Sequence, residues 1–334
     1  MTALAELHAH GVGVDWSRFF AGSGAVRVGL PTYAFEHESF WPLGGRGVGD
    51  AAAFGLVSAG HPLLDGVVEL ADDEGVLLTG RLSVGSHGWL ADHVVGGRVL
   101  VPGTALLELV VRAGDEVGCG CVEELTLAAP LVLPERGGVR VQVRVGVGDG
   151  SGRRSVVVHS RLEGAVEGPW VLHAAGVLAV DGGGVLVGGV FDASVWPPVG
   201  AELVDLDGFY EARGVEGFGY GPVFQGLRGV WRRGGEVFAE VSLPEGVAGD
   251  AGAFGLHPAL LDAGLHAAWF LGGSGDGGGV PFSWSGVSLH ASGASVVRVR
   301  LVGVGEGVVS VAVVDVSGAP VVSVESLAMR ALPA

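Results

Sequence analysis

One histidine of this chain stands where a base would be useful. His93 lies a short glycine-containing loop before Pro102 and Gly103, where an apolar helix is expected to begin. An imidazole can take up a proton, and the free N–H groups at a helix start can hold a polarised carbonyl oxygen. Removal of a proton from carbon beside a thioester or ketone needs both. Because the chain holds 63 glycines, the pattern His93-x3-Gly97-x4-Pro102 is not specific alone and needs a partner.

Asp262 is the candidate partner. It lies four residues before His266 in an apolar segment, residues 258–269, and in a helix this spacing puts both side chains on one face. Because the rest of that face is apolar, we expect a desolvated carboxyl with a raised pKa, suited to a general acid that His266 orients. A capping or solvent-exposed role for Asp262 is the alternative.

A third candidate is Tyr220, in the segment Gly219-Tyr220-Gly221-Pro222. The glycines on both sides would let backbone and phenol approach a ligand closely, although a turn with a packed aromatic ring would give the same pattern. His61 and His257 each precede a proline, which indicates extended or turn backbone, and the remaining histidines are interpreted as surface or satisfied core residues. No carboxylate–histidine group has metal-ligand spacing, so no metal site is expected.

Strand and helix patterns place these candidates in two similar halves. Strand patterns cover residues 67–70, 75–84, 139–145, 155–161 and 170–175 in the first half, and 230–231, 237–243, 282–289, 296–302, 308–315 and 321–327 in the second. Each half has one convincing helix, at 104–113 and 258–269. This predicts an α+β fold in which an antiparallel sheet wraps around a central helix, twice over. Related by a pseudo-two-fold axis, the halves could bring His93 and Asp262 into one pocket.

Composition narrows the possible functions. The net charge is −17 and the chain has no lysine, which argues against nucleic-acid or anionic-membrane binding and excludes Schiff-base chemistry. Cys119 and Cys121 are one residue apart and are interpreted as reduced, structural thiols. The chain shows neither a secretory signal nor an apolar run long enough to span a bilayer. We therefore expect a soluble, cytoplasmic protein.

The first 45 residues differ from the rest. They are rich in aromatic residues, lack regular periodicity and are interrupted by prolines at positions 31 and 42. Such a segment could hardly form a core of its own, so we expect it to lie extended across another domain. Residues 44–49 are expected to form a flexible joint.

Together these motifs resemble the dehydratase domain of modular type I polyketide synthases. His93, Gly97 and Pro102 match the family's H-x3-G-x4-P, residues 219–224 match its G-Y-G-P-x-F, and Asp262 with His266 matches its D-x3-Q/H. The match covers residues 54–332. Residues 1–45 resemble the linker that follows an acyltransferase domain in the same synthases.

The resemblance implies a double hotdog fold, with the half that carries the histidine at 46–190 and the half that carries the aspartate at 191–334. It also implies loss of water from a 3-hydroxyacyl thioester. His93 would be the base and Asp262 the acid, and substrate would be positioned by a set of residues consisting of Gly97, Pro102, Gly103, Tyr220, Gly221, Pro222 and His266.

The implied setting is antibiotic biosynthesis on a multifunctional synthase. Substrate would arrive on the phosphopantetheine of an acyl carrier protein, and no cofactor would bind directly. Acyltransferase and ketoreductase domains would be neighbours, and a homodimer is expected. The alternatives are a double-bond shift or pyran-type cyclisation at the same site, a hotdog thioesterase, or an inactive structural domain.

Overall fold

The computed structural model describes residues 2–26, 55–71, 75–165, 168–180, 193–272 and 279–330. The chain divides into two compact units, Met1–Gly47 and Val48–Ala334. In the described part of the first unit, two short helices, α1 (Thr2–Ala9) and α2 (Trp16–Phe19), bury no side chain. The absence of a core was expected, whereas the helices replace the extended chain predicted there. The predicted joint at 44–49 lies outside the described residues.

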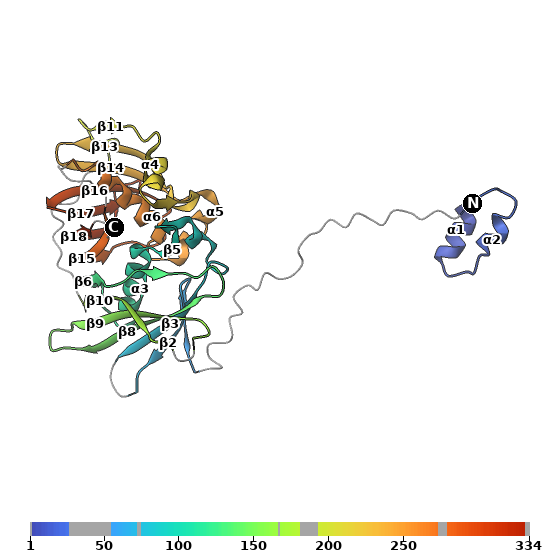
Figure 1. The fold of residues 1–334 in the computed structure, drawn as a ribbon, viewed down its shortest axis with the longest axis horizontal. Coiled ribbons are helices and arrows are strands. Elements are labelled where there is room, and N and C mark those ends of the chain that lie inside the picture. Colours follow the sequence, from blue (N-terminus) through green and yellow to red (C-terminus); the bar gives the residue numbers. More distant parts are fainter. Residues whose placement is uncertain are drawn as a thin grey trace. The chain divides into compact units, whose positions relative to one another are not determined.

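The second unit is built on one long antiparallel sheet (Figure 1). Its first half contains β1 (Val57–His61), β2 (Leu64–Glu69), β3 (Val76–Leu82), β6 (Cys121–Leu127), β8 (Val139–Gly148), β9 (Arg154–Leu162) and β10 (Val171–Ala179). Its second half contains β11 (Glu202–Val204), β13 (Leu227–Arg233), β14 (Glu236–Ser242), β15 (Val280–Leu289), β16 (Val296–Gly305), β17 (Val308–Val314) and β18 (Pro320–Arg330).

The strands are ordered β1-β2-β3-β8-β9-β10-β6-β15-β18-β17-β16-β14-β13-β11. Each half thus supplies seven neighbouring strands, and the halves join where β6 pairs with β15. The antiparallel sheet predicted for each half is thus present, and the two are joined edge to edge. Within the described residues the two sheets share hydrogen bonds at the junction, because β6 has β10 on one side and β15 on the other.

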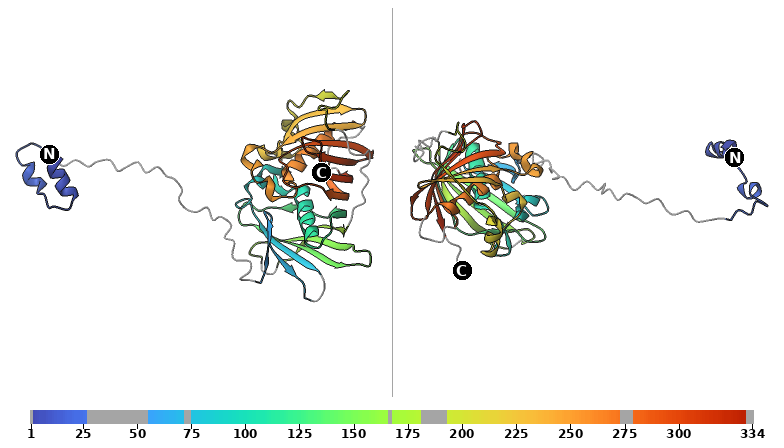
Figure 2. Two further views of the ribbon diagram at one scale, coloured as in Figure 1. Left: turned by 180° about the vertical axis from the view of Figure 1, so that it is seen from behind. Right: turned by 90° about the horizontal axis from the view of Figure 1, so that it is seen from above.

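Two helices run beside this sheet, one from each half (Figures 1 and 2). The first, α3 (Gly103–Glu116), contains the predicted helix 104–113. The second, α6 (Pro258–Leu265), continues as a 3-10 turn, η5 (His266–Phe270), so the helix predicted over 258–269 changes type after Leu265. Shorter elements are η2 (Gly88–Asp92), α4 (Phe209–Val215), η3 (Pro222–Phe224), α5 (Glu245–Ala248) and η4 (Ala251–Ala253).

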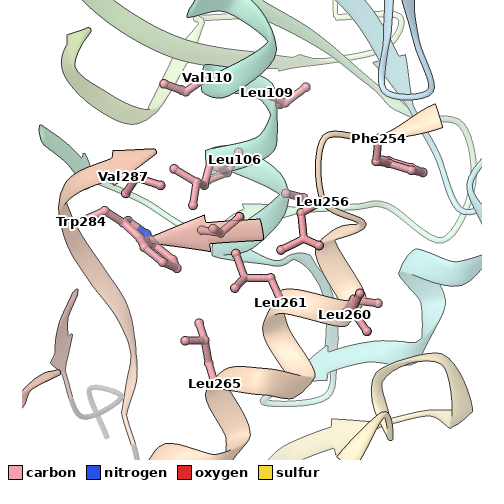
Figure 3. Close-up of a cluster of buried hydrophobic side chains, with 14 of the residues drawn as sticks. Leu106, Leu109, Val110, Phe254, Leu256, Leu260, Leu261, Leu265, Trp284 and Val287 are labelled. Atoms are coloured by element: carbon pink, nitrogen blue, oxygen red, sulfur yellow. The ribbon is translucent and has the colours of Figure 1, made fainter. Parts of the chain in front are cut away.

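The core forms where α3, α6 and β15 meet (Figure 3). Leu106 and Leu109 of α3, Leu261 of α6 and Trp284 of β15 are all at least 96% buried. Burying a side chain of this size contributes about 1.5–3 kcal/mol, so this cluster fixes how the two helices pack. Since each helix carries part of the candidate site, the same contacts position the site.

Candidate active site

His93 is held by a tight hairpin in a second, smaller sheet. β4 (His93–Val95) pairs with β5 (Arg98–Val101), and the two-residue turn between them has φ values of +57° at Gly96 and +74° at Gly97. Both values lie in the left-handed region that glycine adopts without strain, as such hairpin turns require. Gly97 therefore matters for the turn, and the turn places His93 across from Leu100.

The hydrogen bond at the far side of the ring fixes the tautomer of His93. Its Nδ1 lies 2.9 Å from the carbonyl oxygen of Leu100, and a carbonyl can only accept, so Nδ1 carries the proton. In the neutral imidazole, Nε2 then keeps a free lone pair. Nε2 lies 3.9 Å from Oδ2 of Asp262, and both side chains are buried. The structure thus brings together the two residues that the sequence paired from opposite halves.

Asp262 is oriented by the next turn of its own helix. Nε2 of His266 lies 3.1 Å from Oδ2 of Asp262, as the four-residue spacing predicted. The other ring nitrogen of His266, Nδ1, is buried without a hydrogen-bond partner among the described residues. Since a buried unpaired N–H is costly, the proton lies on Nε2, which donates to Asp262.

The pKa of Asp262 departs from the prediction. Burial acts to raise the pKa of this carboxyl, but the hydrogen bond from His266 and the charges of His93 and His266 outweigh it, so the pKa is lowered. The raised pKa expected from an apolar helix face is therefore wrong. For His93, burial lowers the pKa despite the opposing effect of Asp262, which favours the neutral imidazole.

Tyr220 is joined to His93 by backbone pairing between the halves. β12 (Phe218–Tyr220) pairs with β4, with Tyr220 opposite His93 and Gly219 opposite Val94. The Tyr220 ring centroid is 4.1 Å from that of His266 and 5.9 Å from that of His93. Burial, followed by the charge of Asp262, raises the pKa of Tyr220, so its hydroxyl stays a donor.

The glycines around Tyr220 serve this pairing. A Cβ on Gly221 would overlap the side chain of Asp92, and one on Gly219 would lie 3.2 Å from Cβ of Val94. Asp92 accepts two hydrogen bonds here, from the N–H of Gly221 to its carbonyl and from the N–H of Val223 to its carboxylate. The close approach predicted for these glycines is thus made to β4 and Asp92.

A cavity of about 830 Å³ encloses these groups. Of the predicted site residues, the cavity is lined by His93, Gly103, Tyr220, Asp262 and His266. The other four, Gly97, Pro102, Gly221 and Pro222, are not among its lining residues. Pro102 caps α3 and Pro222 begins η3, so both shape the backbone beside the cavity.

Gly103, the first residue of α3, lies at a narrow point of the cavity wall. A Cβ at this position would lie 2.9 Å from Cδ1 of Leu127 and 3.4 Å from Cβ of Pro281. A larger residue would therefore push into the lining. Glycine leaves the helix start open toward the cavity.

A buried carboxylate that the sequence reasoning missed ties the two halves together. Glu108 of α3 accepts hydrogen bonds from the backbone N–H groups of Gly255 (2.7 Å) and Leu256 (3.1 Å), just before α6. His61 donates to it through Nε2 at 3.1 Å. His61 was interpreted only as a turn residue, and no sequence pattern marked Glu108, because its partners are backbone groups far along the chain.

Two findings concern metal binding and membrane spanning in the part of the chain that the structure describes. Within the ranges that the structure describes, no group of three or more His, Cys, Asp or Glu side chains could hold a metal ion. None of the helices in that part combines the length and apolar character needed to cross a bilayer. Cys119 and Cys121 are buried and are not joined by a disulfide.

A buried histidine from one half and a buried aspartate from the other, facing each other at one cavity, are the arrangement expected of a dehydratase of the double hotdog class. The chain belongs to the polyketide synthase dehydratase domains. The family model described as the polyketide synthase dehydratase domain matches residues 61–161, and that described as the polyketide synthase dehydratase N-terminal domain matches residues 189–334.

Comparison with individual relatives gives the same family. Polyketide synthase GfsA of Streptomyces halstedii is 56% identical over 339 residues, covering 100% of this chain but 4% of its own length. This chain therefore corresponds to a small part of that relative. The dehydratase domain from the terminal module of the rifamycin polyketide synthase is 48% identical with a TM-score of 0.78, covering 84% of this chain and 100% of its own.

A bifunctional dehydratase-cyclase domain in ambruticin biosynthesis is 43% identical with a TM-score of 0.73, over 83% of this chain and 100% of its own. The predicted family, fold and dehydratase role are confirmed. The domain limits at 45 and 190 stay predictions.

Proposed function

We propose that this domain removes water from a 3-hydroxyacyl thioester on an acyl carrier protein and yields the α,β-enoyl thioester, as a hydro-lyase. The observation that carries the proposal is that Nε2 of His93 lies 3.9 Å from Oδ2 of Asp262 at the cavity. The neutral form of His93 is favoured, and its Nε2 then has a free lone pair. A base and an acid so close can act on neighbouring carbons of one substrate.

The proposed reaction moves two protons. Nε2 of His93 takes the proton from C2, and the N–H of Gly103 stabilises the developing enolate oxygen. As the C2–C3 double bond forms, the C3–O bond breaks and Asp262 protonates the departing hydroxyl, which leaves as water. His93 is then protonated and Asp262 ionised, so transfer of one proton from His93 to Asp262 restores the starting state.

The acid must hold a proton although its histidine neighbours lower its pKa. A bound acyl chain displaces water from the cavity, and desolvation disfavours both charged forms, so the pair shifts toward neutral His93 and protonated Asp262. Because His266 donates to Oδ2, the proton of Asp262 belongs on Oδ1. Tyr220, which stays protonated, can hydrogen-bond the β-hydroxyl.

The remaining assignments follow from this reaction. Elimination of water is redox-neutral and uses groups that the chain itself supplies, so we propose that no cofactor binds directly. The phosphopantetheine arm of the carrier would bring the substrate. Neighbouring acyltransferase and ketoreductase domains, homodimerisation and a cytoplasmic location complete the proposal.

The test is incubation of the domain with a synthetic 3-hydroxyacyl pantetheine, followed by mass measurement of the product. We expect loss of one water, with turnover reduced at least about 10³-fold in His93→Ala and in Asp262→Asn, since each variant removes one of two obligatory proton transfers. Wild-type turnover in both variants would contradict the proposed roles.

The same assay separates the alternatives. A double-bond shift would also give loss of one water, but to a product with a different retention time and without the conjugated enoyl chromophore. On a substrate that carries a second hydroxyl along its chain, loss of one water to a product that keeps no double bond would indicate cyclisation after dehydration. Release of free acid would indicate a thioesterase, and no reaction with any substrate would indicate an inactive domain.

A further inference from the structure

Exposed residues line the cavity at two places. Exposed Ala128, Pro130 and Arg330 are among its lining residues, and so are exposed Gly96, Arg98 and Glu216. These groups lie at opposite ends of β5, because Arg98 adjoins the Gly96-Gly97 turn whereas Val101 pairs with Leu131 of β7 (Leu131–Val132). His93 sits across from Leu100, between the two ends. The cavity is therefore a channel that passes the acid–base pair.

Gly103 gives the channel a direction. Its position beside Leu127 and Pro281 puts the oxyanion N–H of the proposed reaction on the side of the channel that ends at Arg330. If the thioester carbonyl binds there, the carrier arm enters from that side. The substrate carbons beyond C3 then continue the other way, toward the Gly96 end.

An aromatic wall lines that second part. The Phe218 ring stacks on Tyr220 with centroids 6.2 Å apart, and Trp269 meets Phe218 edge-on at 5.8 Å. The guanidinium of Arg213 lies 3.9 Å from the Trp269 ring centroid and is itself paired with Glu216 at 2.7 Å. Arg213 thus helps to hold Trp269 in place, and Trp269 is one of the residues that line the cavity.

We propose that Trp269 is a specificity-determining residue that contacts the distal part of long acyl chains and so favours them over short ones. Trp269 lies seven residues after Asp262, in η5 beyond the end of α6, where it meets Phe218. Short acyl groups end before it, whereas long ones lie against the indole. This inference rests on the proposed function for the direction of the chain.

The test compares binding of two unreactive ligands, butyryl-pantetheine and dodecanoyl-pantetheine, by calorimetry. In Trp269→Ala we expect the Kd of the dodecanoyl compound to rise about tenfold, the effect of about 1.4 kcal/mol of lost contact, and that of the butyryl compound to change less than twofold. Trp269→Phe should recover most of the long-chain affinity. In turnover, kcat/KM for 3-hydroxydodecanoyl-pantetheine should fall in parallel, with the 3-hydroxybutyryl compound spared.

Trp170→Ala is the matched control, because this half-buried indole also faces an arginine, Arg161 at 4.8 Å, but does not line the cavity. It should leave both Kd values unchanged. Equal weakening of both ligands in Trp269→Ala, or weakening of neither, would overturn the inference. Because the ligands do not react, these results stand whether or not the domain dehydrates, and a failure of turnover alone would count against the proposed function instead.

Discussion

At the scale of the residue, the proposed reaction needs one proton on the pair His93 and Asp262, and the pKa of each of these side chains is lowered. Burial lowers the pKa of His93 below its ordinary 6.5. For Asp262, burial acts to raise the pKa, but the neighbouring His266 and His93 outweigh it and lower the pKa. The proposed active form has neutral His93 and protonated Asp262. Activity is then lost at low pH as His93 gains a proton and at high pH as Asp262 loses one.

His266 sets the alkaline side of this profile. Its hydrogen bond and charge lower the pKa of Asp262, so His266→Ala should raise that pKa. The proton then stays on Asp262 to higher pH, and the alkaline limb of kcat/KM against pH should move upward. His266→Gln keeps an N–H donor and should move the limb less. An alkaline limb that stays in place or moves downward in His266→Ala would contradict this role.

Much of the site could be predicted from residue types, but not its protonation. His93, Asp262 and His266 lie in motifs with fixed spacing. The Leu100 carbonyl that selects the tautomer of His93 is a backbone group, so no residue type in the sequence indicates it. The pKa of Asp262 was predicted in the wrong direction because the helix face suggested burial alone, whereas His93 approaches from 169 positions away in the chain.

At the scale of the element, the pairing of β12 with β4 places Tyr220 beside His93. The variant Gly221→Ala tests whether this arrangement requires the close approach of Gly221 to Asp92. The backbone at Gly221 has φ −79°, which alanine tolerates, so the cost comes from overlap with Asp92. We expect a loss of about 1–3 kcal/mol in the free energy of unfolding, measured with urea. In an Asp92→Ala background the loss should shrink, and an equal loss in both backgrounds would argue against the contact.

β6 is one of the elements that the sequence did not predict, and it shows where local pattern fails. Its sequence, CVEELTL, has two adjacent glutamates and no clean alternation, so it did not indicate a strand. Pairing with β10 and β15 on its two sides imposes the strand, and that pairing is known only once the halves are together. Strands such as β8, with buried valines alternating with exposed arginines, could be predicted directly.

At the scale of the whole molecule, α3 is fastened to the start of α6 by polar contacts within a mostly apolar core. Oγ1 of Thr104 donates to the carbonyl of Pro258 at 3.0 Å, and Glu108 accepts from the N–H groups of Gly255 and Leu256. A buried carboxylate with three donors is costly to remove, because the donors are left unpaired.

Glu108→Ala should therefore lower the free energy of unfolding by about 3 kcal/mol, measured by urea titration. Glu116→Ala is the control, on the same helix, where the carboxylate is exposed and pairs with Arg112 across one turn. That change should cost less than about 1 kcal/mol. Similar losses in the two variants would show that Glu108 does not connect the halves as the contacts indicate.

The pairing of β12 with β4 also limits how this domain can be recombined with a relative. An exchange of halves between two parents would put Asp92 and Val94 from one beside Gly219 and Gly221 from the other. A mismatch there would misplace the tyrosine even if both sheets folded. We therefore expect a working hybrid to need residues 92–97 and 217–223 from the same parent. These two segments must be exchanged together although they lie in different halves.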